Sequence, residues 1–195
     1  MTARKTQQNA PGTETAILVA YAELIEEVGT DDVSFRIIAS RAGVGERTVF
    51  RYYPARADLL LATAAWIEST VFSRAASESI FDVPLAIREA MTAYERRPEL
   101  AHVVAETAMR GVNGADPAPH REEFERLLDR EVTGLDDDER LAIVTALSHL
   151  DSSTTWVTMR HELGMRGRDI ADAAAWAAEA VLDPLRGRAA ERPHA

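Results

Sequence analysis

Residues 33–54 carry the stretch VSFRIIASRAGVGERTVFRYYP, which decides the fold of the N-terminal part of the chain. Ser34 can cap a first short helix, and Gly43 supplies the positive φ that a tight turn needs. Gly45 can cap a second short helix, which Pro54 ends. Two short helices joined by a tight turn predict a helix-turn-helix, whose second helix enters the major groove of DNA.

The rest of the chain has the apolar periodicity of helices and no pattern typical of strands. Apolar residues spaced at i, i+4, i+7 and i+8 predict a helix that begins at Thr13 and that Gly29 ends. Further helices are predicted over residues 56–73, 83–96, 98–111, 118–133, 136–163 and 168–186. We therefore expect an all-α protein, in which an N-terminal three-helix helix-turn-helix domain precedes a larger helical domain.

The composition excludes several classes of protein. The chain has 195 residues, 46% of them hydrophobic, and no cysteine, so disulfides and thiolate metal sites are excluded. No apolar run reaches the ~18 residues that span a bilayer, and the N-terminus lacks the apolar stretch of a signal peptide. We therefore expect a soluble, cytoplasmic protein. Neither a hydrolase nucleophile motif nor a phosphate-binding glycine loop occurs, so nothing in the sequence supports catalysis or a cofactor.

Charge is distributed unevenly along the chain. The net charge of −10 is contrary to the broad basic surface of a protein that coats nucleic acid nonspecifically. Residues 33–56 nevertheless hold five arginines and a single glutamate. A basic segment on an acidic protein is suited to a small, directed contact with DNA.

Residues 13–62 resemble the N-terminal part of the TetR family of bacterial regulators. The matching positions are Ile17-Leu18, Leu24, Glu27-Val28-Gly29, Ile38-Ala39, Ala42-Gly43-Val44, Thr48-Val49-Phe50-Arg51-Tyr52-Tyr53, Arg56 and Leu59-Leu60. Three positions depart from the family's pattern: Gly45 replaces a usual serine, Ala55 replaces the usual serine or asparagine that caps the fourth helix, and Ala57 replaces a usual acid. Residues 63–195 are similar to the family only in their helical content and length.

The resemblance implies an Ω-shaped homodimer with about nine helices in each subunit. It also implies an effector that binds in the C-terminal body and weakens DNA binding. We expect a flexible N-terminal arm over residues 1–12 and a helix-turn-helix DNA-binding domain over 13–55. An effector-binding and dimerisation domain is expected over 56–188, followed by a C-terminal tail over 189–195.

Base contacts are expected from the start of the second helix of the motif. Arg47 can bridge guanine O6 and N7, and the methyl group of Thr48 can meet a thymine methyl. Glu46 either accepts from a cytosine amino group or balances neighbouring arginines. Arg36 can reach a base or a phosphate. The complete set of candidate DNA-binding residues is Ser34, Arg36, Gly45, Glu46, Arg47, Thr48, Phe50, Arg51, Tyr52 and Arg56.

Other residues of the motif have different expected roles. The family resemblance implies that Tyr52 and Arg56 clamp phosphates, and Ser34 can join them. Val49 and Tyr53 are expected in the core, whereas Phe50 is suited to either place. Arg4 and Lys5 can reach the minor groove as a flexible arm. The alternative for each arginine is an ordinary solvated surface charge.

The C-terminal body is expected to hold an apolar effector pocket with a few polar groups. The candidates for its lining are Trp66, His102, Met109, Trp156 and Met159, and the alternative for each of them is ordinary core packing. His102 and Glu106, at i and i+4, are too few to predict a metal site.

The last two predicted helices are suited to a dimer interface, because the penultimate one is apolar around much of its circumference and the final one carries an alanine stripe. The candidate interface residues are Leu147, Leu150, Thr154, Ala174, Ala177, Ala178 and Val181. The alternative is a core that lies wholly within one subunit.

These patterns together predict a homodimeric DNA-binding repressor that recognises a near-palindromic operator and is released by an unknown small-molecule effector. Within DNA binding, the alternatives are an activator or a regulator without an effector. The alternative from another class is a helical protein-interaction module that has kept the fold and lost sequence-specific DNA binding.

Overall fold

The structure is a computed structural model that describes residues 12–29, 31–110 and 120–189. Ten α-helices lie in these ranges, which contain no strand beyond an isolated bridge between Val132 and Ala189. The all-α prediction is therefore confirmed. The predicted arm, with Arg4 and Lys5, and the tail beyond Ala189 lie outside the described residues. The chain divides after Thr63 into two compact units, which are described separately below.

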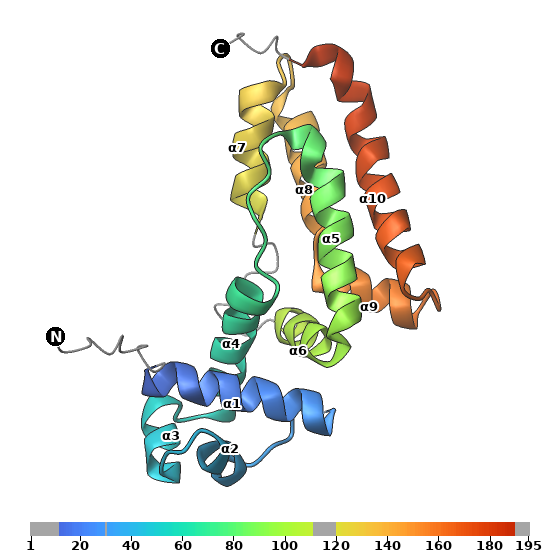
Figure 1. Cartoon of the computed structure of the whole chain (residues 1–195). Coiled ribbons are helices and arrows are strands. Elements are labelled where there is room, and N and C mark those ends of the chain that lie inside the picture. Colours follow the sequence, from blue (N-terminus) through green and yellow to red (C-terminus); the bar gives the residue numbers. More distant parts are fainter. Residues whose placement is uncertain (1–11, 30, 111–119, 190–195) are drawn as a thin grey trace, which may run out of the picture. The chain divides into compact units, whose positions relative to one another are not determined.

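The first unit contains α1 (Thr13–Val28), α2 (Phe35–Arg41), α3 (Glu46–Tyr52) and the start of α4 (Arg56–Trp66), as Figure 1 shows. Its core is made of side chains without exposed surface, namely Ile17, Tyr21, Ile25, Ile38, Val49 and Leu59. These residues come from all four helices, so each helix is held by its apolar face. Gly29 ends α1 in the left-handed conformation that the sequence predicts.

The second unit begins at Ala64, within α4, and this helix continues through one π-helical turn, Ile67–Val71. Short 3₁₀ turns, Ile80–Asp82 and Asp183–Arg188, flank its main helices. Those helices are α5 (Val83–Arg96), α6 (Pro98–Met109), α7 (Arg121–Glu131), α8 (Asp137–Leu150), α9 (Ser153–His161) and α10 (Arg168–Leu182). Packing is most extensive between α5 and α10, which run side by side in Figure 1, while α6 packs on α9 and α7 on α8.

The long helix predicted over 136–163 is wrong, because the chain breaks between α8 and α9 at Asp151 and Ser152. The Ser152 hydroxyl donates to the carbonyl of His149 over 2.7 Å and accepts from the amide of Thr155 over 3.2 Å. These bonds cap the start of α9 and compete with a continuous helix. Asp136, by contrast, caps α8 in a capping box with Glu139, at the predicted start.

Among the described residues, no helix combines the length and the apolar character that crossing a membrane requires.

Candidate nucleic-acid interface

The second helix of the motif, α3, is held to the first unit by a single fully buried residue. Val49 has no exposed surface, whereas Glu46, Arg47 and Arg51 are exposed and Thr48 is half-buried. One anchored position in a helix of seven residues leaves most of its circumference to solvent. The arrangement therefore presents a surface suited to a groove of DNA, with Arg47 and Thr48 at its N-terminal end.

The turn between α2 and α3 is fixed by backbone geometry. Gly43 has a backbone φ of +68°, which residues with a side chain rarely adopt. The amide of Val44 then donates to the carbonyl of Ala39 over 3.0 Å, which ties the turn to α2. Gly45 precedes α3 in an extended conformation and supplies no side-chain cap. The serine that is usual at this position in the family would offer a hydroxyl to a phosphate, and Gly45 offers none.

The five arginines of the basic segment differ in whether their charge is paired. Arg41 forms a two-bond ion pair with Glu27, with distances of 2.8 and 2.6 Å, and approaches Glu23 at 3.5 Å. Its charge is therefore largely cancelled at the surface of α1 and α2. Arg36 and Arg47 are exposed, and neither has an ion pair with any described residue.

The guanidinium of Arg56, the predicted phosphate clamp, makes several contacts within the first unit. It donates to the carbonyl oxygens of Asp31 and Val33, over 2.9 and 2.5 Å, and to the Tyr21 hydroxyl over 3.4 Å. It also lies over the ring of Phe35, with 5.6 Å from Cζ to the ring centroid. Arg56 thus connects the start of α4 to the loop between α1 and α2, and three of the five N–H donors of its guanidinium are used inside the unit.

The remaining candidates occupy the exposed edge of α2 and α3. Phe50 is 48% exposed, and its ring packs at a tilt against that of Phe35 with 4.7 Å between the ring centroids, so it contributes to both the core and the surface. Tyr52 is 39% exposed, and the guanidinium of Arg51 lies 5.5 Å from its ring centroid. The Ser34 hydroxyl accepts from the Ile37 amide over 3.4 Å and caps α2 as predicted.

Sequence reasoning missed one residue of this edge, Ile37, whose side chain is 47% exposed. It adjoins Arg36 on α2 and is suited to apolar contact with a sugar or a thymine methyl. The signal was present, because Ile37 falls off the spacing of the buried residues Phe35 and Ile38.

Tyr53 is buried, as predicted, and donates to Glu14 Oε1 over 3.4 Å. Burial, with a smaller effect of Glu14, raises the pKa of Tyr53 to about 12. Its phenol is therefore an uncharged part of the core that joins the end of α3 to the start of α1.

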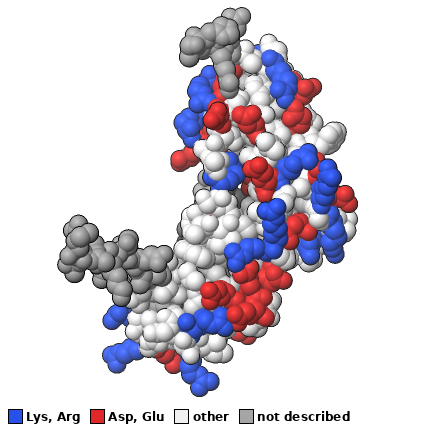
Figure 2. All heavy atoms as spheres, viewed as in Figure 1, with Lys and Arg blue, Asp and Glu red and all other residues white. Residues whose placement is uncertain are grey.

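Charge separates clearly on the first unit. Figure 2 shows acidic side chains gathered over the C-terminal end of α1 and basic ones projecting from the edge where α2 and α3 lie. The acidic group includes Glu23 and Glu27, which hold Arg41. The basic edge that remains is narrow, which is suited to a local DNA contact rather than to nonspecific coating.

The predicted effector-pocket residues are only partly brought together. Trp156 has no exposed surface, donates from Nε1 to Glu95 over 2.9 Å and lies 5.2 Å from the His102 ring. Met109 is 60% exposed at the end of α6 and does not line an interior. Trp66 and Met159 are half-buried.

His102 makes a contact that the sequence did not predict, with Nε2 lying 2.6 Å from Nε2 of His161. His102 Nδ1 lies 2.8 Å from the Pro98 carbonyl oxygen and must donate to it, so the proton between the two rings is carried by His161. The pair joins α6 to the end of α9. Burial, His102 and the arginines Arg160 and Arg166 lower the pKa of His161.

The predicted dimer residues fall into two groups. Leu147, Ala174 and Ala178 have no exposed surface within their own unit, where they fill the core instead of facing a partner. Leu150, Thr154, Ala177 and Val181 are half-buried. The large apolar side chains that α8 and α10 expose are others, Leu141 at 53% and Trp176 at 74%.

A helix-turn-helix with an exposed basic second helix, followed by a larger helical unit, is the architecture of DNA-binding regulators of the helix-turn-helix class. Residues 17–63 match the model of the bacterial regulatory proteins of the tetR family. The first unit therefore resembles the N-terminal, DNA-binding part of the TetR-family regulators.

Solved structures of such regulators share the fold of the chain. A TetR regulator from Rhodococcus sp. RHA1 is 22% identical, with a TM-score of 0.60 over 89% of this chain and 96% of that one. A variant of TetR from Acinetobacter baumannii AYE, in complex with minocycline, is 18% identical, with a TM-score of 0.61 and coverage of 90% and 98%. SCO0253 from Streptomyces coelicolor is 18% identical, with a TM-score of 0.57 and coverage of 94% and 100%. No curated protein matches the chain.

Proposed function

We propose that this chain is a repressor that binds a near-palindromic operator as a homodimer and leaves it when a small molecule binds to the second unit. The observation that carries the DNA-binding part is the solvent-facing surface of α3, where Arg47 has no ion pair with any described residue. Two copies of α3 related by a two-fold axis would enter successive major grooves about 34–36 Å apart.

The homodimer is supported by exposed apolar side chains on two helices that pack against each other. Leu141 on α8 and Trp176 on α10 are 53% and 74% exposed. A tryptophan buries roughly 150–250 Å² when it is covered, so an exposed one favours a partner surface. Trp176→Glu is expected to give monomers by light scattering, whereas Leu163→Glu, which changes a residue that is 65% exposed outside these helices, should leave the dimer intact.

The small-molecule effector is supported by the division of the chain into a DNA-binding unit and a larger helical unit. The Acinetobacter regulator, which shares the fold, is bound to minocycline. A ligand of the second unit can release DNA only through unequal affinity for the bound and free conformations, with a coupling of about 1–3 kcal/mol.

The experiment that tests DNA binding selects duplexes from random DNA with the purified full chain at moderate salt. We expect a palindromic sequence with half-sites one helical turn apart. The variant with both Arg47→Ala and Thr48→Ala should lose specific binding while it stays folded. Arg41→Ala is the control: it also removes one arginine charge, but that charge is already paired with Glu27, so this variant should keep specific binding.

Salt dependence separates this proposal from a protein-interaction module of the same fold. Phosphate contacts make affinity fall steeply as salt rises, whereas an apolar protein interface responds little. Recovery of no DNA sequence by a folded dimer would overturn the repressor and favour the interaction module.

A further inference from the structure

A groove in the second unit lies between the coil after the π-helical turn and one face of α5. Its volume is about 600 Å³, which is in the range of pockets that hold drug-sized ligands. On the α5 side the lining extends from Leu85 to Arg96, mostly at the spacings of three and four residues that define one helix face. With a rise of about 1.5 Å per residue, this face is roughly 16 Å long. The groove is therefore suited to an elongated ligand.

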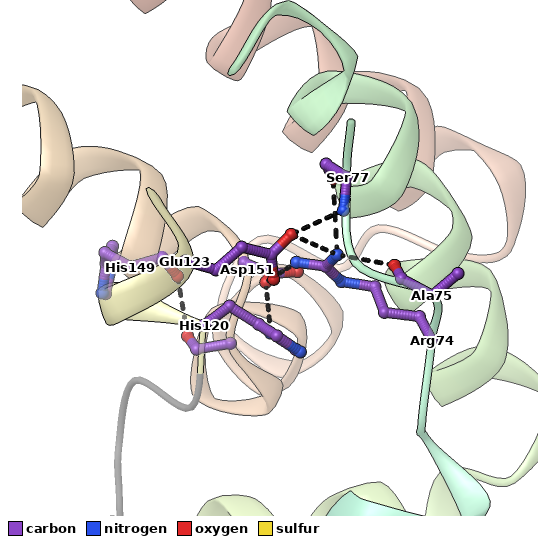
Figure 3. Close-up of polar contacts among 8 residues, drawn as sticks. Arg74, Ala75, Ser77, His120, Glu123, His149 and Asp151 are labelled. Atoms are coloured by element: carbon purple, nitrogen blue, oxygen red, sulfur yellow. Dashed lines mark hydrogen bonds and ion pairs between the residues drawn. The ribbon is translucent and has the colours of Figure 1, made fainter. Parts of the chain in front are cut away.

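The wall that the coil forms is fixed by a buried cluster of charged side chains (Figure 3). The guanidinium of Arg74, in the coil, lies 3.3 Å from Glu123 Oε1 on α7 and 3.2 Å from Asp151 Oδ2. His120 Nδ1 lies 2.7 Å from the same Asp151 oxygen, so a protonated His120 balances the second carboxylate. The Ser77 amide also donates to Glu123 over 2.7 Å. Arg74 therefore holds the wall in place, and its charge is neutralised within the cluster.

Apolar side chains line the groove on both sides. Leu85, at one end of the α5 face, is 59% exposed. Phe72, directly after the π-helical turn, is buried, and its ring lies edge-on to that of Tyr94 with 4.8 Å between the centroids. Removing apolar surface from water is favourable. A hydrocarbon chain laid along the groove would cover the exposed side chain of Leu85.

The other end of the α5 face carries an arginine whose charge is unpaired. Arg96 is exposed and has no ion pair with any described residue. Arg88 pairs with Asp172 on α10, but these side chains are 44% and 42% exposed, so the bridge contributes little and a ligand can replace it. Glu89 is the single acid among the described residues that line the groove. The donors of Arg96 therefore favour an anion at this end.

We propose that the groove along α5 binds an elongated amphiphilic carboxylate, whose carboxylate pairs with Arg96 and whose apolar chain runs past Phe72 to Leu85. This inference rests on the proposed function, because it gives the chemical class of the effector. A guanidinium can hold a carboxylate through two parallel hydrogen bonds. Glu89 disfavours a second negative charge along the chain, and Arg96 disfavours an ammonium group in place of the carboxylate.

The test uses the full chain and four matched probes: decanoate, 1-decanol, decylammonium and butanoate, each below the concentration at which it forms micelles. Binding is measured by calorimetry at neutral pH. The ion pair with Arg96 should make decanoate bind about threefold or more tightly than 1-decanol and decylammonium. Butanoate has the carboxylate without a chain that reaches Leu85, so it should bind about tenfold or more weakly than decanoate.

Two variants at the ends of the groove assign these preferences to it. Arg96→Gln should abolish the preference for decanoate over 1-decanol. Its control is Arg126→Gln, which removes an exposed arginine of α7 that lies outside the groove. Leu85→Asn should weaken decanoate several-fold and leave butanoate unchanged. Its control is Leu163→Asn, at a residue that is 65% exposed outside the groove.

Three outcomes would overturn the site: no preference for decanoate, a preference that survives in Arg96→Gln, or an equal loss in Arg126→Gln. The last would mean that the overall charge of the unit attracts the anion. The regulatory role is tested separately on the selected DNA. Decanoate that binds without releasing DNA would contradict that role. Failure to select any DNA would contradict the proposed function, whereas calorimetry would still decide whether the groove binds the carboxylate.

Discussion

The hydrogen bonds of Arg56 to the loop between α1 and α2 make a quantitative prediction about its structural role. In Arg56→Ala, the carbonyls of Asp31 and Val33 lose charge-assisted hydrogen bonds of 2.9 and 2.5 Å. Each such bond contributes about 1.5–3 kcal/mol. Because the site is half-buried and water can replace part of the loss, we expect about 2–4 kcal/mol of lost stability in total.

The assay is urea denaturation of the full chain followed by helical circular dichroism, with DNA affinity measured in parallel. Arg56→Lys keeps the charge and loses the two-pronged geometry, so it should recover only part of the stability. Arg41→Ala removes a surface ion pair with Glu27 and should cost at most about 1 kcal/mol. Arg36→Ala removes an arginine that has no ion pair with a described residue and should change stability by less still.

The result that would refute this reasoning is an Arg56→Ala protein as stable as the wild type with weakened binding to every DNA sequence. That combination is the signature of a lost phosphate contact. A destabilised protein that binds DNA normally once folded would instead confirm the structural role.

Three further predictions concern pH and capping. Tyr53 has a pKa of about 12 in the folded chain, against about 10 in the unfolded chain. Its contribution to stability should therefore be complete below pH 10 and be lost as pH rises toward 12. In alkaline denaturation, Tyr53→Phe should lack this pH dependence. His161 has a lowered pKa, so the unfolded chain takes up its proton first, and stability should fall as pH drops below about 6.5. In acid melting curves His161→Gln should lose less stability than the wild type, and an equal loss would contradict the shift. Ser152→Ala removes the cap of α9 and should cost about 0.5–2 kcal/mol in thermal unfolding, whereas Ser69→Ala, at an exposed hydroxyl that caps no helix, should cost less.

Local sequence determined the helix-turn-helix. Each of its boundaries depends on residues close in the chain: Ser34 caps α2, Gly43 adopts the left-handed turn, and Gly29 ends α1. Such signals depend on backbone geometry and not on distant partners, so they can be predicted without the fold. The helix break at Ser152 is also a local feature. The run of hydroxyl residues that follows Asp151 in the sequence could have predicted it.

Only the tertiary structure decided what the charged residues do. Arg36 and Arg56 look alike in the sequence, yet one faces solvent and the other binds the carbonyls of Asp31 and Val33. The cluster of Arg74, Glu123 and Asp151 unites positions up to 77 residues apart, which no local pattern relates. A helix boundary is set by neighbouring backbone groups, whereas the role of a charge depends on its burial and on the partners that packing brings to it.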